Sequence, residues 1–417
     1  MKKYLILAAS AVLFLAACAK VETIKNDVPE AIDFGVYAGN AATKAVSATD
    51  YNTLTTALLQ GSSNGFGVFA YYTDAADYAS NTKPNFMYNQ QVTYSSSKWS
   101  YSPIKYWPNE HGASAVSTDT DKLTFLAYAP YVANFDLAND KGVSIKDNQA
   151  TAAAATEGII AMTANDAAGD ATLTFKVPAS AENQIDLLYG VMGATYTDVE
   201  NQTIGTVGNA LENLTKQKTG GHIDILFKHS LSKVQIDIKD VIDQVDPTSA
   251  VAPTTTKVVV KSMKLIGTTI GTQGKLNLYT HAWGDVTSAT EFTVAPLPAA
   301  ISVDAAPTAF PTIAGVDEDG LTNKIDLMLI PSASPATTLT GVEIVYYVCT
   351  EDANLADGVS VVENKISKSF ASAVTLEQGK QYNLNILLGL TSIDLDATVA
   401  DWTVQGTTNV DLPKNVQ

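Results

Sequence analysis

The apolar residues of this chain occur in short runs that alternate with polar or small residues and end at turn residues. One such run lies near the C-terminus, where the alternating residues are Tyr382, Leu384, Ile386, Leu388 and Leu390. A side-chain period of two is typical of a strand with one buried face. Thr, Val, Ile and Tyr, which favour strands, are abundant throughout. The sequence therefore predicts a mostly-β protein.

A polar stretch divides the predicted strands into two groups. It runs from Val199 to Gly221, contains the pair Gly220-Gly221 and shows no sustained period, so it is the best candidate for a domain boundary. Two consecutive groups of about seven or eight strands favour two β-sandwiches over a parallel α/β fold.

The second group opens with a run whose parity changes. Ile225 and Phe227 share one face, whereas Val234 and Ile236 fall on the opposite parity. A strand that switches faces in this way usually carries an extra residue, so a β-bulge is predicted near Ser232.

The N-terminus has the pattern of a bacterial lipoprotein signal. Lys2 and Lys3 precede the apolar run from Leu5 to Ala17, which is too short to span a bilayer stably. The run ends in Leu-Ala-Ala followed by Cys18, which fits a lipobox. We therefore expect residues 1–17 to be a lipoprotein signal peptide, and the mature chain to start at a lipidated Cys18 that anchors it in a membrane.

Composition excludes several classes of protein. The formal net charge is −17 and all 26 basic residues are lysine, which argues against nucleic-acid binding. Besides Cys18 the chain has only Cys349, so a disulfide framework is excluded. Cys349 is predicted to be a buried small hydrophobic residue.

No motif for catalysis or metal binding is present. None of the four histidines has metal-ligand spacing with another histidine, a cysteine or an acid, and no nucleophile elbow, phosphate loop or dinucleotide fingerprint occurs. The prediction is a protein that is not an enzyme and has no cofactor and no metal site. His229 is expected to be a partly buried, hydrogen-bonded strand residue.

The segment just inside the mature N-terminus combines a strand with a candidate cleavage site. Ile32, Phe34, Val36 and Ala38 alternate with polar or small residues, and Lys44 follows among small residues. From these residues alone, an ordinary first strand with an ordinary surface lysine remains open as an alternative.

Several segments together resemble the fimbrillin superfamily of Bacteroidetes, the FimA/Mfa-like pilins of type V pili. They span nearly the whole mature chain in the expected order: the lipobox at 15–18, then 32–34 leading to 42–45, 66–71, 123–130, 186–189, 227–234, 382–386 and the late pair 401–402. The resemblance implies two tandem transthyretin-like (Greek-key) β-sandwich domains. It also implies an outer-membrane lipoprotein from which a protease removes the N-terminal strand, so that subunits polymerise by strand exchange into adhesive surface fimbriae.

The C-terminal tail fits this implied route. The residues of one face alternate over 404–412 as those of the first strand do, and they are Val404, Gly406, Thr408, Val410 and Leu412. An incoming strand must match the face and parity of the strand that it replaces. We therefore expect these residues to form the donor strand, and Ile32, Phe34, Val36 and Ala38 to mark the strand that is replaced. Pairing of the tail within its own domain is the alternative.

Under this interpretation the chain has five parts. They are the signal peptide (1–17), an N-terminal segment with the removable strand (18–44), an N-terminal β-sandwich (45–218), a C-terminal β-sandwich (219–402) and the candidate donor strand (403–417). Processing is expected between Lys44 and Ala45. Family members matured by an arginine-specific protease have arginine at this position, so Lys44 is a departure, and an uncleaved anchor subunit is an alternative.

The expected partners are other fimbrillin subunits, in a homopolymer or with anchor or tip subunits, and surface ligands of a host or another bacterium. A lipid-anchored glycan-binding protein is the alternative from another functional class. The aromatic pairs Trp99/Tyr101 and Tyr106/Trp107 are the candidate sugar platform, although core or fibre-interface positions explain them equally well.

Overall fold

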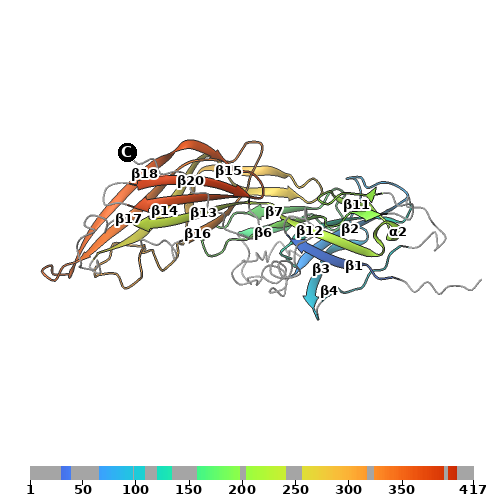
Figure 1. The fold of residues 1–417 in the computed structure, drawn as a ribbon, viewed down its shortest axis with the longest axis horizontal. Coiled ribbons are helices and arrows are strands. Elements are labelled where there is room, and N and C mark those ends of the chain that lie inside the picture. Colours follow the sequence, from blue (N-terminus) through green and yellow to red (C-terminus); the bar gives the residue numbers. More distant parts are fainter. Residues whose placement is uncertain are drawn as a thin grey trace, which may run out of the picture.

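The computed structural model describes residues 30–38, 65–96, 98–108, 120–133, 157–197, 203–240, 256–316, 324–388 and 393–401. Within these ranges nearly all regular structure is β-strand, which confirms the all-β prediction. The molecule is elongated, with one sheet at one end and two further sheets towards the other (Figure 1).

Seven strands of the first sheet lie side by side in the order β1-β12-β8-β5-β2-β3-β4, and among the described residues β11 adds an eighth by pairing with β5. Their bounds are β1 (Asp33–Ala38), β12 (His222–His229), β8 (Leu188–Met192), β5 (Lys122–Ala129), β2 (Phe66–Asp74), β3 (Met87–Ser95), β4 (Lys98–Ser100) and β11 (Leu211–Leu214). Two short strands, β9 (Tyr196–Thr197) and β10 (Thr203–Ile204), form a separate antiparallel two-stranded sheet.

The central strands of this sheet are buried on both faces. In β2, Phe66 and Val68 belong to one buried cluster, whereas Phe69 and Tyr71 belong to another. All eight residues of β5 are buried. This double burial explains why residues 66–72 of β2 and 125–129 of β5 are apolar or glycine throughout and do not alternate with polar residues.

The remaining strands form two sheets that share one core. A six-stranded sheet of the described residues contains β18 (Val359–Thr375), β17 (Thr338–Glu351), β14 (Thr256–Asn277), β7 (Thr172–Lys176) and β6 (Gly158–Met162) in that order, with β15 (Trp283–Val294) also paired to β14. A four-stranded sheet has the order β16 (Lys324–Leu329), β13 (Ser232–Asp240), β19 (Lys380–Leu388) and β20 (Ile393–Asp401). Inward-facing residues of both sheets belong to a single buried cluster, as in a β-sandwich.

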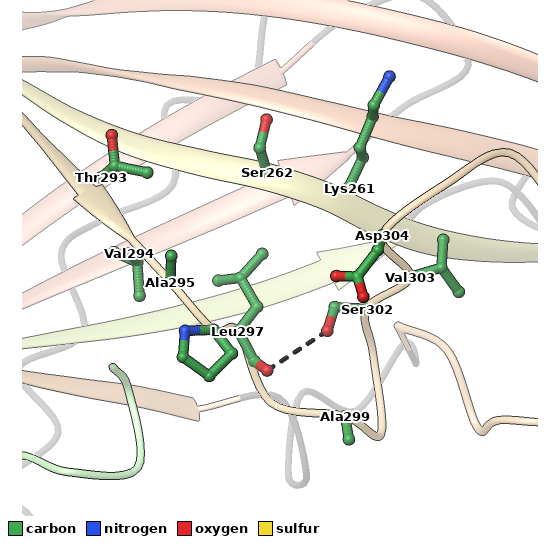
Figure 2. Close-up of a pocket in the computed structure, with 11 residues that line it drawn as sticks. Lys261, Ser262, Thr293, Val294, Ala295, Leu297, Ala299, Ser302, Val303 and Asp304 are labelled. Carbon is green, nitrogen blue, oxygen red and sulfur yellow. Dashed lines mark hydrogen bonds between the residues drawn. The ribbon is translucent and has the colours of Figure 1, made fainter. Parts of the chain in front are cut away.

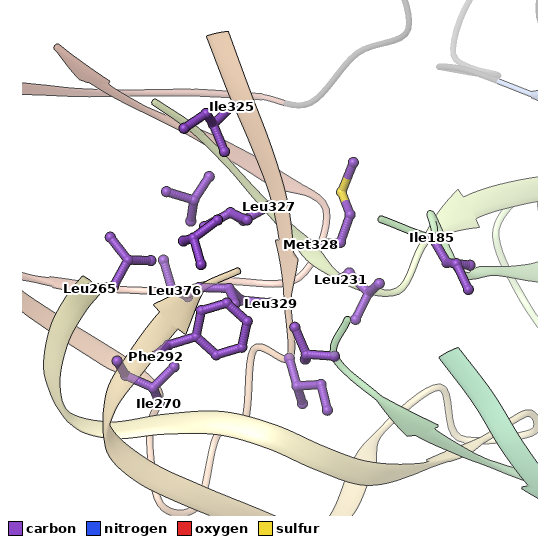
Figure 3. Close-up of a cluster of buried hydrophobic side chains, with 14 of the residues drawn as sticks. Ile185, Leu231, Leu265, Ile270, Phe292, Ile325, Leu327, Met328, Leu329 and Leu376 are labelled. Carbon is purple, nitrogen blue, oxygen red and sulfur yellow. The ribbon is translucent and has the colours of Figure 1, made fainter. Parts of the chain in front are cut away.

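That cluster also reaches the first sheet. Figure 3 shows Ile185 and Leu231, from segments next to the eight-stranded sheet, together with Leu327 and Leu329 of β16. Phe69 and Tyr128 of the first sheet belong to the same cluster. Packing is therefore continuous along the described part of the molecule.

The predicted bulge near Ser232 is wrong. The run breaks instead into β12 and β13, which belong to different sheets, and the residues between them turn the chain. The Ser230 amide and hydroxyl both donate to the Leu187 carbonyl, at 2.9 and 2.6 Å. The parity changes because the chain leaves one sheet and enters another, each of which buries its own face.

Strand pairing also crosses the predicted domain boundary at 218/219. β6 and β7 come from the first predicted domain, yet β7 pairs with β14 of the second. Conversely, β12 lies after the boundary and pairs with β1 and β8. The division into two tandem domains stays a prediction.

One short helix, α2 (Lys216–Thr219), precedes β12. Its N-cap is Thr215, whose hydroxyl accepts a hydrogen bond from the Lys218 amide at 3.2 Å. Gly220 follows at φ 65°, the left-handed conformation that ends many helices. No helix in the described part of the chain is long and apolar enough to cross a membrane.

Candidate functional site: the first strand and its groove

β1 lies at one edge of the eight-stranded sheet and is held by strands that are distant in sequence. It pairs in parallel with β12, from Asp33 opposite His222 to Ala38 opposite Phe227 (Figure 1). Just before β1, the Ile32 amide donates to the Lys105 carbonyl at 2.9 Å, and the Trp107 amide donates to the Glu30 carbonyl at 3.0 Å. Residues 30–32 are therefore hydrogen-bonded to residues 105–107, and residues 33–38 are paired with β12.

The apolar face of β1 fills the core of this end of the molecule. Ile32, Phe34 and Val36 are each no more than 3% exposed. The Phe34 ring meets Phe66 and Phe125 edge to face, with centroids 6.0 and 6.1 Å away. The alternation that predicted this strand is thus confirmed for these three side chains. Ala38 is placed by its backbone pairing alone.

The groove is the space that β1 occupies between β12 and the segment after β4, and two aromatic residues of that segment, Tyr101 and Trp107, pack over β1. The Tyr101 hydroxyl donates to the Ile32 carbonyl at 2.9 Å, and the Trp107 indole N–H donates to the Gly221 carbonyl at 2.9 Å. Both side chains are buried, and burial raises the pKa of Tyr101 to about 12. Both polar groups thus donate hydrogen bonds to backbone carbonyls, as is usual for buried Tyr and Trp.

This burial bears on the candidate sugar platform. Tyr101 and Trp107 lie in the core, whereas Tyr106 is 50% exposed. Trp99 packs edge to face against Phe66 with centroids 5.1 Å apart. Neither predicted pair presents two aromatic faces to solvent, so the core explanation holds for three of the four residues.

The polar face of β1 carries a chain of charged groups. His222 Nδ1 lies 2.9 Å from Asp33 Oδ2, and His222 Nε2 lies 3.3 Å from Asp224 Oδ1. The Asp224 contact, opposed in part by burial and supported by the Asp33 carboxylate, raises the pKa of His222 above its ordinary value of 6.5. Nearby, Lys216 Nζ pairs with Glu30 Oε2 at 2.9 Å.

These contacts are expected to make the attachment of β1 depend on pH. Because the folded-state pKa of His222 is raised, its stabilisation is fully present below pH 6.5 and is lost as the pH rises through the folded pKa. His222→Gln is therefore expected to flatten the decline of the unfolding free energy as the pH rises above 6.5, measured by urea unfolding. The effect should stay below about 1 kcal/mol, because His222 and Asp33 are partly exposed.

His281 supplies the control for this prediction. Burial, with a further contribution from Lys228, lowers its pKa to about 4. Its stabilisation is therefore present above pH 6.5 and is lost as the pH falls through that value towards 4. His281→Gln should change the acid side of the profile and leave the decline above pH 7 in place. An unchanged alkaline decline in His222→Gln would contradict the attachment.

A separate cavity of about 310 Å³ lies on the six-stranded sheet, lined by residues 261–262, 293–297, 299 and 302–304 (Figure 2). Lys261 Nζ points away from it and pairs with Glu363 Oε2 at 2.8 Å. The Ser302 hydroxyl lies within hydrogen-bond distance of two carbonyls, that of Pro298 at 2.9 Å and that of Leu297 at 3.4 Å. Lys261 and Ser302 of this cavity thus already have partners. Among the described residues, no group of three or more His, Cys, Asp or Glu is placed to hold a metal ion.

The remaining predicted site residues lie outside the described residues. These are the lipidation site Cys18, the processing site Lys44 and Ala45, and the candidate donor strand, Val404, Gly406, Thr408, Val410 and Leu412. They stay predictions. Sequence reasoning missed the roles of His222 and Asp33, because 189 residues separate them and neither belongs to a recognisable motif.

A model of the fimbrillin-like family matches residues 43–402 of this chain. The chain therefore belongs to the fimbrillin-like family. The match begins at residue 43, so β1 precedes the matched part of this fimbrillin-like chain.

Two known proteins are similar to this chain. Fimbrium subunit Fim1C of Phocaeicola vulgatus is 25% identical over 317 residues, which cover 75% of this chain and 69% of that protein. The crystal structure of a fimbrial protein from Bacteroides vulgatus superposes with a TM-score of 0.56 at 21% identity, over 90% of this chain and all of the other. The structural likeness shows a shared fold, and the family resemblance predicted from the sequence is confirmed.

Proposed function

We propose that this fimbrillin-like chain is a structural subunit of adhesive surface fimbriae. It is exported as a lipoprotein through Cys18, cut between Lys44 and Ala45, and polymerised when β1 leaves its groove and the strand Val404–Leu412 of a neighbouring subunit takes its place. Membership of the fimbrillin-like family and the similarity to a fimbrium subunit of Phocaeicola vulgatus support the fimbrial part of this proposal.

The observation that carries the polymerisation step is the packing of β1. Ile32, Phe34 and Val36 fill a core whose other walls come from β2, β5, β12 and the segment after β4. Without β1, those walls and the backbone groups of the β12 edge would face water, at a cost that persists until another strand fills the groove. A groove of this kind drives association with any strand of matching pattern.

The position of the cut decides between two roles. Cleavage after Lys44 would release β1 from the rest of the chain, because β1 ends at Ala38. A chain left uncut would keep both β1 and its lipid, as an anchor subunit does. The lysine at this position, where arginine-specific maturation requires arginine, makes the anchor role the second candidate.

N-terminal sequencing of the protein from isolated surface fibres tests the proposal. We expect a mature start at Ala45. A lipidated Cys18 on fibre-associated protein would instead establish the anchor role. Deletion of residues 404–417 should abolish polymers after protease treatment while leaving cleavage intact, and undiminished polymerisation would exclude the tail as donor strand.

A further inference from the structure

Gly35 lies in the middle of β1, on the face opposite Phe34, and the space above it is occupied. A Cβ atom at this position would lie 2.6 Å from Asp224 Oδ1 and 2.6 Å from His222 Nε2. The backbone of Gly35 is not in the left-handed region. A side chain at position 35 would therefore displace Asp224 or His222, so glycine is favoured here by space and not by conformation, unlike Gly220.

The two atoms that crowd Gly35 depend on each other. Asp224 is buried, and among the described residues its Oδ1 atom has no hydrogen bond of good geometry. Its compensating charge is the His222 ring, with Nε2 at 3.3 Å. A side chain at position 35 would push His222 away and leave a buried carboxylate oxygen uncompensated, which costs more than the displacement of an exposed side chain.

The other ring nitrogen of His222 contacts β1 itself. Nδ1 lies 2.9 Å from Asp33 Oδ2, two residues before Gly35 and on the same face. An acceptor at position 33 therefore holds the ring in the place that excludes a side chain at position 35. The same ring therefore constrains both positions on the outward face of β1.

We propose that His222 and Asp224 discriminate between strands that could occupy the groove, favouring one that carries a hydrogen-bond acceptor and, two residues later, a glycine on its outward face. This inference rests on the proposed replacement of β1 and adds a rule for the replacing strand. β1 satisfies it with Asp33 and Gly35. The rule fixes the register of β1 against β12. If β1 were shifted by two residues, position 33 or 37 would replace glycine opposite the contact between His222 and Asp224.

The rule also bears on the chain's own tail. If Val404 and its alternating partners face inward, the outward residues are Gln405, Thr407, Asn409 and Asp411. None is glycine. The tail of a second copy is therefore a poorer match to this groove than β1 is, so β1 must be cut free before the tail can take its place.

A double-mutant cycle in the full chain tests the glycine position whether or not replacement occurs. Gly35→Ala is expected to lower the folding equilibrium constant about tenfold, measured by urea unfolding. Gly284→Ala is the matched control, because Gly284 also lies in a strand but has no atom within 4 Å of the added Cβ; it should be neutral or slightly stabilising. In a His222→Ala background, Gly35→Ala should cost about threefold or less. Equal effects of Gly35→Ala and Gly284→Ala would overturn the proposal.

Peptide exchange tests the selection itself. A specific protease site placed at residues 41–44 allows the folded full chain to be cut behind β1, and labelled peptides are then offered. The peptide 29–40 should enter the groove, whereas its Gly35→Val variant and a peptide of residues 402–414 should bind at least about tenfold more weakly. Equal uptake of these peptides would overturn the rule. If the cut chain stays folded and takes up no peptide, the proposed replacement fails, and the mutant cycle still decides the role of Gly35.

Discussion

Replacing Phe34 with alanine is expected to lower the unfolding free energy of the eight-stranded sheet by about 3–5 kcal/mol, the range for deletion of a fully buried phenylalanine ring. Phe34 is 3% exposed and contacts three aromatic rings, those of Phe66, Tyr101 and Phe125. These walls belong to three different segments, so the cavity cannot collapse by moving a single side chain. Urea unfolding followed by tryptophan fluorescence measures the change, since Trp99 and Trp107 lie in the same cluster.

Tyr106→Ala is the matched control for the Phe34 substitution. Tyr106 is an aromatic residue of the same end of the molecule, but its side chain is 50% exposed. Its truncation should change the unfolding free energy by no more than about 0.5 kcal/mol. If both substitutions lower the unfolding free energy equally, Phe34 does not fill a core and the packing of β1 does not stabilise this end of the molecule.

A chain that begins at Ala45, and so lacks β1, is expected to melt at least about 10 °C lower and to self-associate. Burial of Ile32, Phe34 and Val36 contributes about 1.5–3 kcal/mol per side chain, and these are upper estimates because the unfolded chain already buries some surface. Their sum approaches the net stability of about 5–15 kcal/mol of a typical domain. The exposed groove would also pair with other chains. Thermal unfolding and light scattering measure the two effects.

A chain that begins at Lys20 is the control for this truncation, because it lacks the signal peptide and keeps β1. It should melt normally and stay monomeric, and a synthetic peptide of residues 29–40 should restore both properties to the chain that begins at Ala45. Identical melting of the two chains, with no effect of the peptide, would show that β1 contributes nothing to the core.

The prediction of strands from sequence succeeded where one face of a strand is buried. β1 and β19 were predicted from alternation alone, because the two faces of such a strand meet different environments. Cys349 is buried, as its apolar surroundings indicated. The predicted hydrogen bond of His229 exists, with Nδ1 2.9 Å from the Asp186 carboxylate.

The prediction failed where the information is not local. No sequence pattern predicts β6 (Gly158–Met162), because its short run does not alternate. It is a strand because it pairs with β7 in the folded chain. The change of parity after Phe227 is visible in the sequence, but it marks a change of sheet and not the predicted bulge. Side-chain period reports which residues share a face, and it does not report which sheet that face belongs to.

The sequence by itself determined that this chain is built of strands, that its first strand has one apolar face, and that it resembles fimbrillins. Only the tertiary structure decided that β1 pairs in parallel with β12, that Tyr101 and Trp107 close over it, and that His222 joins Asp33 to Asp224. The physical reason is that local alternation follows from the burial of one face, which each segment encodes alone. The choice of neighbour depends on long-range packing between segments almost 200 residues apart, which no local pattern contains.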